Sequence, residues 1–156
     1  MLKRTIIIFI AGLLLITGAG CSGGSTDKKI DANNVASKTF QVIDKKFPGE
    51  WQVSGTTLKK GAYSENTRYQ IVDEVSKIYP GSMVSLFVDG QRVSSTIRGR
   101  QLSDSGIPKE VAEILKTGQV SMVSGGSIGS KDYQKVYLPL KSAEKTVAVM
   151  TISIPQ

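Results

Sequence analysis

Apolar residues recur every three or four positions in three parts of the chain, which predicts three amphipathic helices. The first spans 31–47 and the second spans 68–79. The third is shorter, begins after Pro108 and ends before Gly118. A Pro-Gly pair directly follows each of the first two segments, and such pairs stop helices.

The clearest β-hairpin lies in the middle of the chain. Residues 82–88 and 91–97 flank Asp89-Gly90, a dipeptide that suits the two-residue type I′ turn. A second hairpin is predicted over 51–60, with its turn at Ser54-Gly55.

Three more strands are predicted in the last part of the chain, over 119–123, 132–141 and 145–154. A short polar turn joins the last two. The Gly/Ser-rich segment 124–130 lacks the strand–glycines–lysine–helix order of a phosphate-binding loop, so we interpret it as a connector. This succession of helices and short-turned strands predicts an α+β fold with an antiparallel sheet.

The N-terminus has the features of a secretory signal. Lys3 and Arg4 precede an apolar run, Ile6–Ile16, which is shorter than the ~20 residues that a bilayer-spanning helix needs. Small residues then lead directly to Cys21, the single Cys of the chain. This order resembles a bacterial lipoprotein signal, although Gly18 stands where an aliphatic residue is usual.

The resemblance to lipoproteins implies three regions. Residues 1–20 would be a signal peptide, Cys21 would carry a diacylglycerol, 21–30 would be a flexible lipid tether, and 31–156 would form a single domain. Two or more acyl chains anchor a protein stably, so we expect an extracytoplasmic protein attached to the membrane. A cleaved secretory signal with a stray Cys and an uncleaved anchor are the alternatives.

The composition excludes several kinds of chemistry. With no His and one Cys in 156 residues, there is no His-based triad, internal disulfide or Cys-based zinc site. No paired-carboxylate or nucleophile motif stands out, so we expect neither an enzyme nor a metal or other cofactor. The net charge of +7 falls to +5 without Lys3 and Arg4. Because this charge is dispersed, we expect contact with lipid headgroups and not with nucleic acid.

Several short motifs, in this order, are similar to those of the single Cache family, the extracytoplasmic PAS-like sensor domains of bacterial receptors. The best match is Tyr133–Lys141, read as YQKVYLPLK. The other matching segments are Leu58–Gly61 with Ile71–Asp73, Val84–Val93, Val111–Leu115 with Gly118, and Thr146–Pro155.

This resemblance implies a five-stranded antiparallel sheet with a long N-terminal helix on one face and short helices and loops on the other. A pocket for a small carboxylate, an amino acid or a similar metabolite would lie on the second face. Ala148, Val120 and Met122 depart from the family pattern near the expected ligand. The alternative is therefore an envelope scaffold that kept the fold and lost the pocket. Since the sequence stops at Gln156, before a second membrane helix, we expect no signalling across the membrane by this chain alone.

Strand alternation selects the candidate ligand-binding residues, because every second side chain lies on the same face of a strand. The first group, on one face of its strand, is Arg92, Ser94 and Thr96, and the second is Tyr133, Lys135 and Tyr137. Arg92 suits a carboxylate, since a guanidinium binds it bidentately and keeps its charge. Asp73 could accept from a ligand amine or from Arg92.

Each candidate also has an ordinary structural explanation. Arg92 could be a surface Arg paired with a neighbouring acid, and the two tyrosines could be sheet packing. Asp73 could be a solvated or structural partner, and Trp51 could belong to the core instead of stacking on a ligand. Lys59-Lys60 are expected to be solvated charges. We expect a lipid-anchored domain that binds a small molecule, a membrane receptor or an envelope protein, without catalysis.

Overall fold

The computed structural model describes residues 30–66, 68–98, 108–128 and 130–156. The expected signal peptide, Cys21 and nearly all of the tether lie outside these residues. Within the described ranges, no helix has the length and apolar character needed to cross a membrane.

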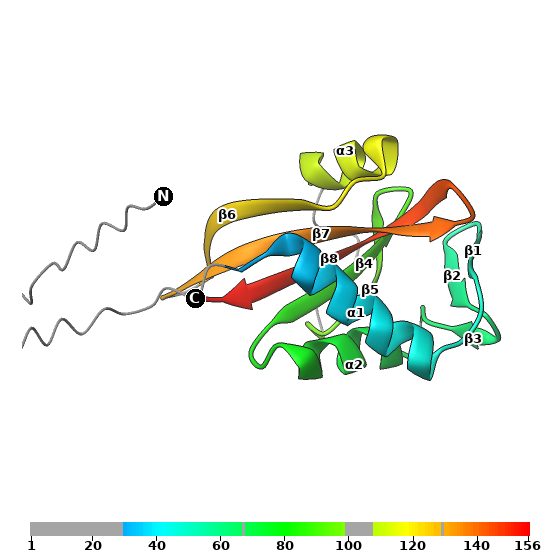
Figure 1. The fold of residues 1–156 in the computed structure, drawn as a ribbon, viewed down its shortest axis with the longest axis horizontal. Coiled ribbons are helices and arrows are strands. Elements are labelled where there is room, and N and C mark those ends of the chain that lie inside the picture. Colours follow the sequence, from blue (N-terminus) through cyan, green and yellow to red (C-terminus); the bar gives the residue numbers. More distant parts are fainter. Residues whose placement is uncertain (1–29, 67, 99–107, 129) are drawn as a thin grey trace, which may run out of the picture.

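The described part of the chain forms three helices and eight strands (Figure 1). The helices are α1 (Ala32–Lys46), α2 (Gln70–Ile78) and α3 (Lys109–Thr117). The strands are β1 (Trp51–Ser54), β2 (Thr57–Lys60), β3 (Tyr63–Ser64), β4 (Met83–Val88), β5 (Gln91–Ser95), β6 (Ser121–Ile128), β7 (Lys131–Ser142) and β8 (Lys145–Pro155).

The strands form two antiparallel sheets. The main sheet has five strands in the order β5-β4-β8-β7-β6, and the smaller has three in the order β1-β2-β3. The predicted α+β class and five-stranded antiparallel sheet are therefore confirmed. The predicted hairpin over 51–60 is confirmed as β1–β2, whereas the third strand of the small sheet, β3, was not predicted because it is only two residues long.

One face of the main sheet is covered by both α1 and α2, and we call it the α1 face (Figure 1). Val35 and Ile43 of α1 and Val72 and Val75 of α2 join one apolar cluster with alternate residues of β4, β7 and β8. The expectation that all the short helices lie on the opposite face is therefore wrong for α2. Its apolar stripe is buried against β4 beside α1.

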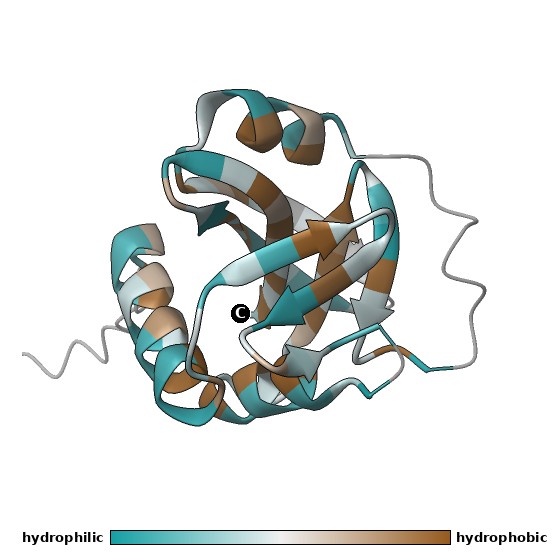
Figure 2. Ribbon diagram, turned by 90° about the vertical axis from the view of Figure 1, so that its right-hand side faces the viewer, coloured by the Kyte–Doolittle hydropathy of each residue, from teal (hydrophilic) through white to brown (hydrophobic). Residues whose placement is uncertain are grey.

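The opposite face is covered by α3 alone among the described helices, and we call it the α3 face. Val111 and Ile114 of α3 pack on Phe87, Tyr137 and Val149 of the sheet. Figure 2 shows apolar positions on the sides of the helices turned toward the strands, with polar positions outward. The amphipathic patterns therefore account for a helix layer on each face.

The predicted turn at Asp89-Gly90 and the predicted end of the third helix at Gly118 are both confirmed. Asp89 and Gly90 both have positive φ, 46° and 78°, as a type I′ turn requires. Gly118 ends α3 in the left-handed region at φ 62°, and its N–H donates to the Ile114 carbonyl at 2.9 Å.

The prediction that 124–130 form a connector is wrong for most of these residues. β6 continues through Ser124 and Ser127 to Ile128, paired with β7. The pairing register shifts between Ser124 and Ser127, at the two glycines. Because the register shifts at this point, the hydrogen bonds between β6 and β7 continue on the far side of the glycines. The Gly-rich composition therefore does not end the strand here.

Candidate functional site

A small cavity of about 150 Å³ lies beside Arg92 on the α3 face. Four strands of the main sheet contribute to its lining, together with the segments that flank them. The described lining residues are Met83, Ser85, Phe87, Arg92, Ile97, Pro108, Lys135, Tyr137, Thr151 and Ser153. It lies on the face away from α1, where the family resemblance places a pocket.

The antiparallel register of the sheet brings these side chains together. Ser85 of β4 pairs with Thr151 of β8, and Thr151 pairs in turn with Tyr137 of β7. Directly opposite residues on neighbouring strands project to the same face, so these three form one row across the floor of the cavity. Met83, Ser153 and Lys135 form the next row in the same way.

Arg92 has an unsatisfied donor beside this cavity. Its guanidinium carbon lies 5.5 Å from the centroid of the Phe87 ring, opposite it on β4. Its Nε is buried, and no acceptor for it is found in the described part of the chain. The same part of the chain provides no acidic ion-pair partner for Arg92. A buried donor without a partner is costly, so an external acceptor would stabilise it.

The other polar groups of the cavity also suit an anion. Lys135 adds a second cation, and Ser85, Thr151, Ser153 and Tyr137 add hydroxyls. Burial, together with the nearby Glu110 carboxylate, raises the pKa of Tyr137, so its phenol remains a hydrogen-bond donor at neutral pH. No Asp or Glu is among the described lining residues. Two cations with several hydroxyl donors can hold a small carboxylate.

Ser94 does not join this site, and the predicted grouping with Arg92 is wrong. The β4–β5 pairing shifts between Leu86 and Phe87, so Arg92 lies opposite Phe87 while Ser94 lies opposite Leu86. This irregularity reverses the alternation along β5. Ser94 therefore points to the α1 face, where its Oγ donates to Glu65 Oε1 at 2.8 Å.

Some of the remaining predicted residues line the cavity beside Arg92, and others lie outside it. Lys135 and Tyr137 line the cavity with Arg92, as the alternation of β7 predicts. Thr96 lies past the end of β5, where its Oγ1 accepts from the Val84 N–H at 3.0 Å. Tyr133, on β7 opposite Pro155, is buried and is not among the residues that line the cavity.

Asp73 is also separate from Arg92. It lies on α2, and both of its carboxylate oxygens accept from Arg98 Nη2 at 2.7 Å. Arg98 in turn lies 4.1 Å from the centroid of the Tyr69 ring. The arrangement is an ordinary ion pair outside the cavity lining, as the structural alternative for Asp73 proposed.

Three hydroxyl residues of the cavity, Ser85, Thr151 and Ser153, were missed by sequence reasoning. A signal for two of them is present, because Thr151 and Ser153 alternate with Met150, Ile152 and Ile154. That alternation is typical of a strand with one polar and one apolar face. Which strand they would face could not be known, since β8 pairs with partners far away in sequence.

Trp51 and Lys60 lie on the other side of the molecule. Trp51 belongs to the core cluster of the α1 face, as its packing alternative proposed. Lys60 was expected to be solvated but is only 6% exposed, so that prediction is wrong. Its Nζ contacts Asp44 Oδ1 at 2.8 Å, donates to the Gly49 carbonyl and lies over the Trp51 ring. These partners compensate the loss of water around the ammonium.

Comparison with known proteins adds no relative: no family model matches the chain, and no curated protein matches it either. Within the described residues, no group of three or more His, Cys, Asp or Glu side chains is placed to hold a metal ion. The function is therefore inferred from the cavity and from the N-terminal sequence.

Proposed function

We propose that this chain is a lipid-anchored extracytoplasmic protein whose Cache-like domain binds a small carboxylate beside Arg92, without catalysis. The observation that carries the proposal is the buried Arg92 Nε, which lacks an acceptor in the described part of the chain and adjoins a cavity with hydroxyls and Lys135. A carboxylate would accept from the guanidinium and neutralise its charge.

The fold supports the Cache-like part of the proposal in outline. The resemblance implies a five-stranded antiparallel sheet with a pocket on the face away from the N-terminal helix, and the cavity lies on that face. The N-terminal sequence through Cys21 supports the lipid anchor. A membrane receptor or another envelope protein would be the partner that responds to the bound ligand.

The volume of the cavity limits the size of the ligand that can bind there. At about 150 Å³ it is smaller than the ~300–1,000 Å³ of typical small-molecule pockets. We therefore favour carboxylates of a few heavy atoms, such as formate, acetate and propionate, over larger amino acids. The same small volume favours a second candidate function, a scaffold that retains the fold and binds no ligand at this place.

Thermal unfolding of the full-length protein in detergent, with and without these carboxylates, tests the proposal. A ligand present at about 100 times its Kd should stabilise the folded state by ~2.7 kcal/mol and raise the Tm. Arg92→Ala should weaken binding roughly 10- to 100-fold, since a hydrogen bond to a charged group contributes ~1.5–3 kcal/mol.

Arg98→Ala is the matched control, because it removes an arginine whose partner is Asp73 and which does not line the cavity. It should leave carboxylate binding unchanged. If no small carboxylate raises the Tm of the wild-type protein, and Arg92→Ala leaves stability unaltered, the binding function is wrong and the scaffold is favoured.

A further inference from the structure

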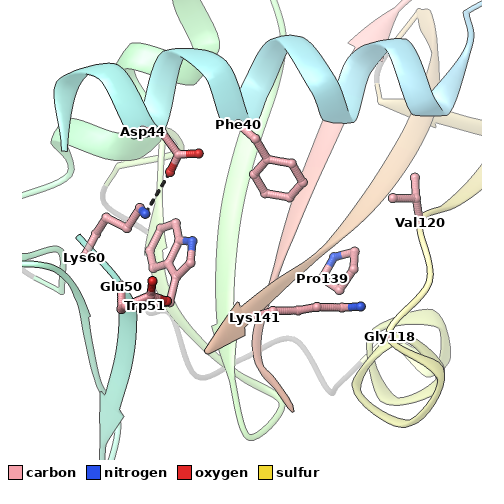
Figure 3. A pocket seen from close by; sticks show the side chains of 9 residues that line it. All are labelled: Phe40, Asp44, Glu50, Trp51, Lys60, Gly118, Val120, Pro139 and Lys141. Atoms are coloured by element: carbon pink, nitrogen blue, oxygen red, sulfur yellow. Dashed lines mark ion pairs between the residues drawn. The ribbon is translucent and has the colours of Figure 1, made fainter. Parts of the chain in front are cut away.

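A second depression lies away from the Arg92 cavity, and we call it the edge groove. It has a volume of about 480 Å³ and lies between α1, the β1–β2 hairpin, the end of β7 and the connection from α3 to β6. The residues that line it are Phe40, Asp44, Glu50, Trp51, Lys60, Gly118, Val120, Pro139 and Lys141 (Figure 3). None of them lines the Arg92 cavity.

The middle of the edge groove is apolar. Phe40 points down from α1 toward Pro139 of β7, with Trp51 on one side and Val120 on the other (Figure 3). Phe40 and Val120 are half-buried, so part of each side chain remains open to a ligand. This part of the groove can bury one aliphatic or aromatic side chain.

One end of the groove is held in place by an ion pair. Lys60 contacts Asp44 of α1 and the Gly49 carbonyl, and its Nζ lies 5.5 Å from the centroid of the Trp51 ring. Because Lys60 already has these partners, it is not available as a cation for a ligand. Instead it fixes Trp51 and the β1–β2 hairpin against α1.

Two charges of the groove have no partner within the described residues. They are the Glu50 carboxylate and the Lys141 ammonium, neither of which takes part in an ion pair or side-chain hydrogen bond there. In Figure 3, Glu50 lies beside Trp51, whereas the Lys141 side chain runs below Pro139 and ends toward Gly118 and Val120. The two free charges therefore lie at opposite ends of the apolar middle.

The balance of charge selects a ligand class. Two acids and two lysines line the groove, so its formal charge is zero and neither an anion nor a cation is favoured overall. A molecule with its own positive and negative ends fits better, if it also carries an apolar side chain. In a free amino acid the two charges flank a single carbon, whereas in a short peptide at least one peptide bond separates them.

We propose that the edge groove binds a short zwitterionic peptide of two or three residues with an apolar side chain. Its N-terminal ammonium would contact Glu50, its C-terminal carboxylate would contact Lys141, and its side chain would pack between Phe40, Trp51 and Pro139. This inference is independent of the carboxylate site, because the two share no lining residue.

Trp51 provides a direct measurement, since it is the only Trp of the chain and lines the groove. Titration of the full-length protein in detergent with leucyl-leucine should change its fluorescence in a saturable manner. N-acetyl-leucyl-leucine amide lacks both charges, and free leucine carries both of them on one carbon. Each of these two should bind at least tenfold more weakly than leucyl-leucine.

Variants at the two ends test the contacts. Lys141→Gln and Glu50→Gln should each weaken leucyl-leucine binding about tenfold. Lys145→Gln changes another exposed lysine of the β7–β8 hairpin outside the groove and should have no effect. Arg92→Ala should also leave peptide binding unchanged, which separates this site from the carboxylate site.

The peptide proposal is overturned if leucyl-leucine produces neither a fluorescence change nor heat in calorimetry at millimolar concentration. Equal affinity for the blocked peptide would overturn it as well, because the charged ends would then play no part. That comparison uses the wild-type protein only, so it remains decisive even if a variant fails to fold.

Discussion

At the scale of single residues, Glu65 is a carboxylate in the interior of the domain. Its side chain is fully buried and accepts from the N–H groups of Ile71 and Val72, at 3.1 and 3.3 Å, and from Ser94 Oγ. It therefore caps the first turn of α2, whose N-cap residue Tyr69 offers no side-chain hydrogen bond. A carboxylate here also benefits from the positive end of the helix dipole.

The titration of Glu65 gives a prediction with a definite sign. Burial raises its pKa above the ordinary 4.5, despite the hydrogen bonds that favour the ionised form. A raised folded-state pKa contributes stability that is complete below the unfolded-state value and is lost as pH rises through the folded-state value. Urea unfolding across this pH range should therefore show a smaller loss of stability with rising pH in Glu65→Gln than in wild type.

Glu74→Gln serves as the control of opposite sign. Hydrogen bonds from Lys46 and Lys77 lower the pKa of Glu74, so its contribution is lost as pH falls. Removing Glu74 should therefore reduce the stability lost on acidification. Parallel stability curves for wild type and Glu65→Gln would contradict the role assigned to burial.

At the scale of elements, the sequence predicts turns and helix ends, which depend on residues close together in the chain. It does not predict the register between strands, which depends on residues far apart in the chain. The Asp89-Gly90 turn and the Gly118 cap need only local backbone geometry, and both were predicted. The β4–β5 irregularity that turns Ser94 away from Arg92 arises from pairing between strands, and no glycine or proline of β5 indicates it. Ser94 was assigned to the wrong face for that reason.

The junction of α1 with the small sheet depends on two glycines that touch. A Cβ placed on Gly61 would lie 2.1 Å from the Pro48 carbonyl oxygen, and one placed on Gly49 would lie 2.6 Å from the Gly61 Cα. Gly61 also has φ +57°. The backbone before β1 thus packs directly on the turn after β2, which only glycine permits.

Gly61→Ala should therefore destabilise the protein strongly. Gly55 is an unusually close control, because it has the same φ of +57° and a Cβ placed on it would meet no atom within 4 Å. Gly55→Ala should cost only the ~1–2 kcal/mol of a left-handed alanine. Gly61→Ala should cost a further ~1–3 kcal/mol, because the backbone must move. Equal midpoints in urea unfolding would show that the close approach contributes nothing.

At the scale of the whole molecule, the two proposed sites lie in different surroundings. The Arg92 cavity opens on the α3 face, and the edge groove adjoins α1, which continues directly from the tether region. A lipid at Cys21 would hold the domain near the membrane through the ten-residue tether 21–30. Both sites would then sample ligands close to the membrane surface.

The anchor itself has a simple test. Cells expressing the wild-type protein should incorporate an alkyne-labelled palmitate into it, whereas Cys21→Ala should incorporate none and should keep its signal peptide. Mass spectrometry of the purified chain measures both changes. Ser22→Ala, next to the proposed lipidation site, should be labelled like wild type. Equal labelling of Cys21→Ala and wild type would exclude lipidation at this residue.

The central place of β8 bears on how the chain reaches its folded state. The β4–β5 and β6–β7 hairpins lie on opposite sides of β8 and are joined in the sheet through it. β8 also follows every other strand of this sheet along the chain. During synthesis, the earlier segments therefore lack the strand that unites them, and the sheet can close only after β8 emerges. Long-range pairing of this kind is slow to form. A chain that delays its own closure in this way is suited to passing through a translocation channel while still unfolded.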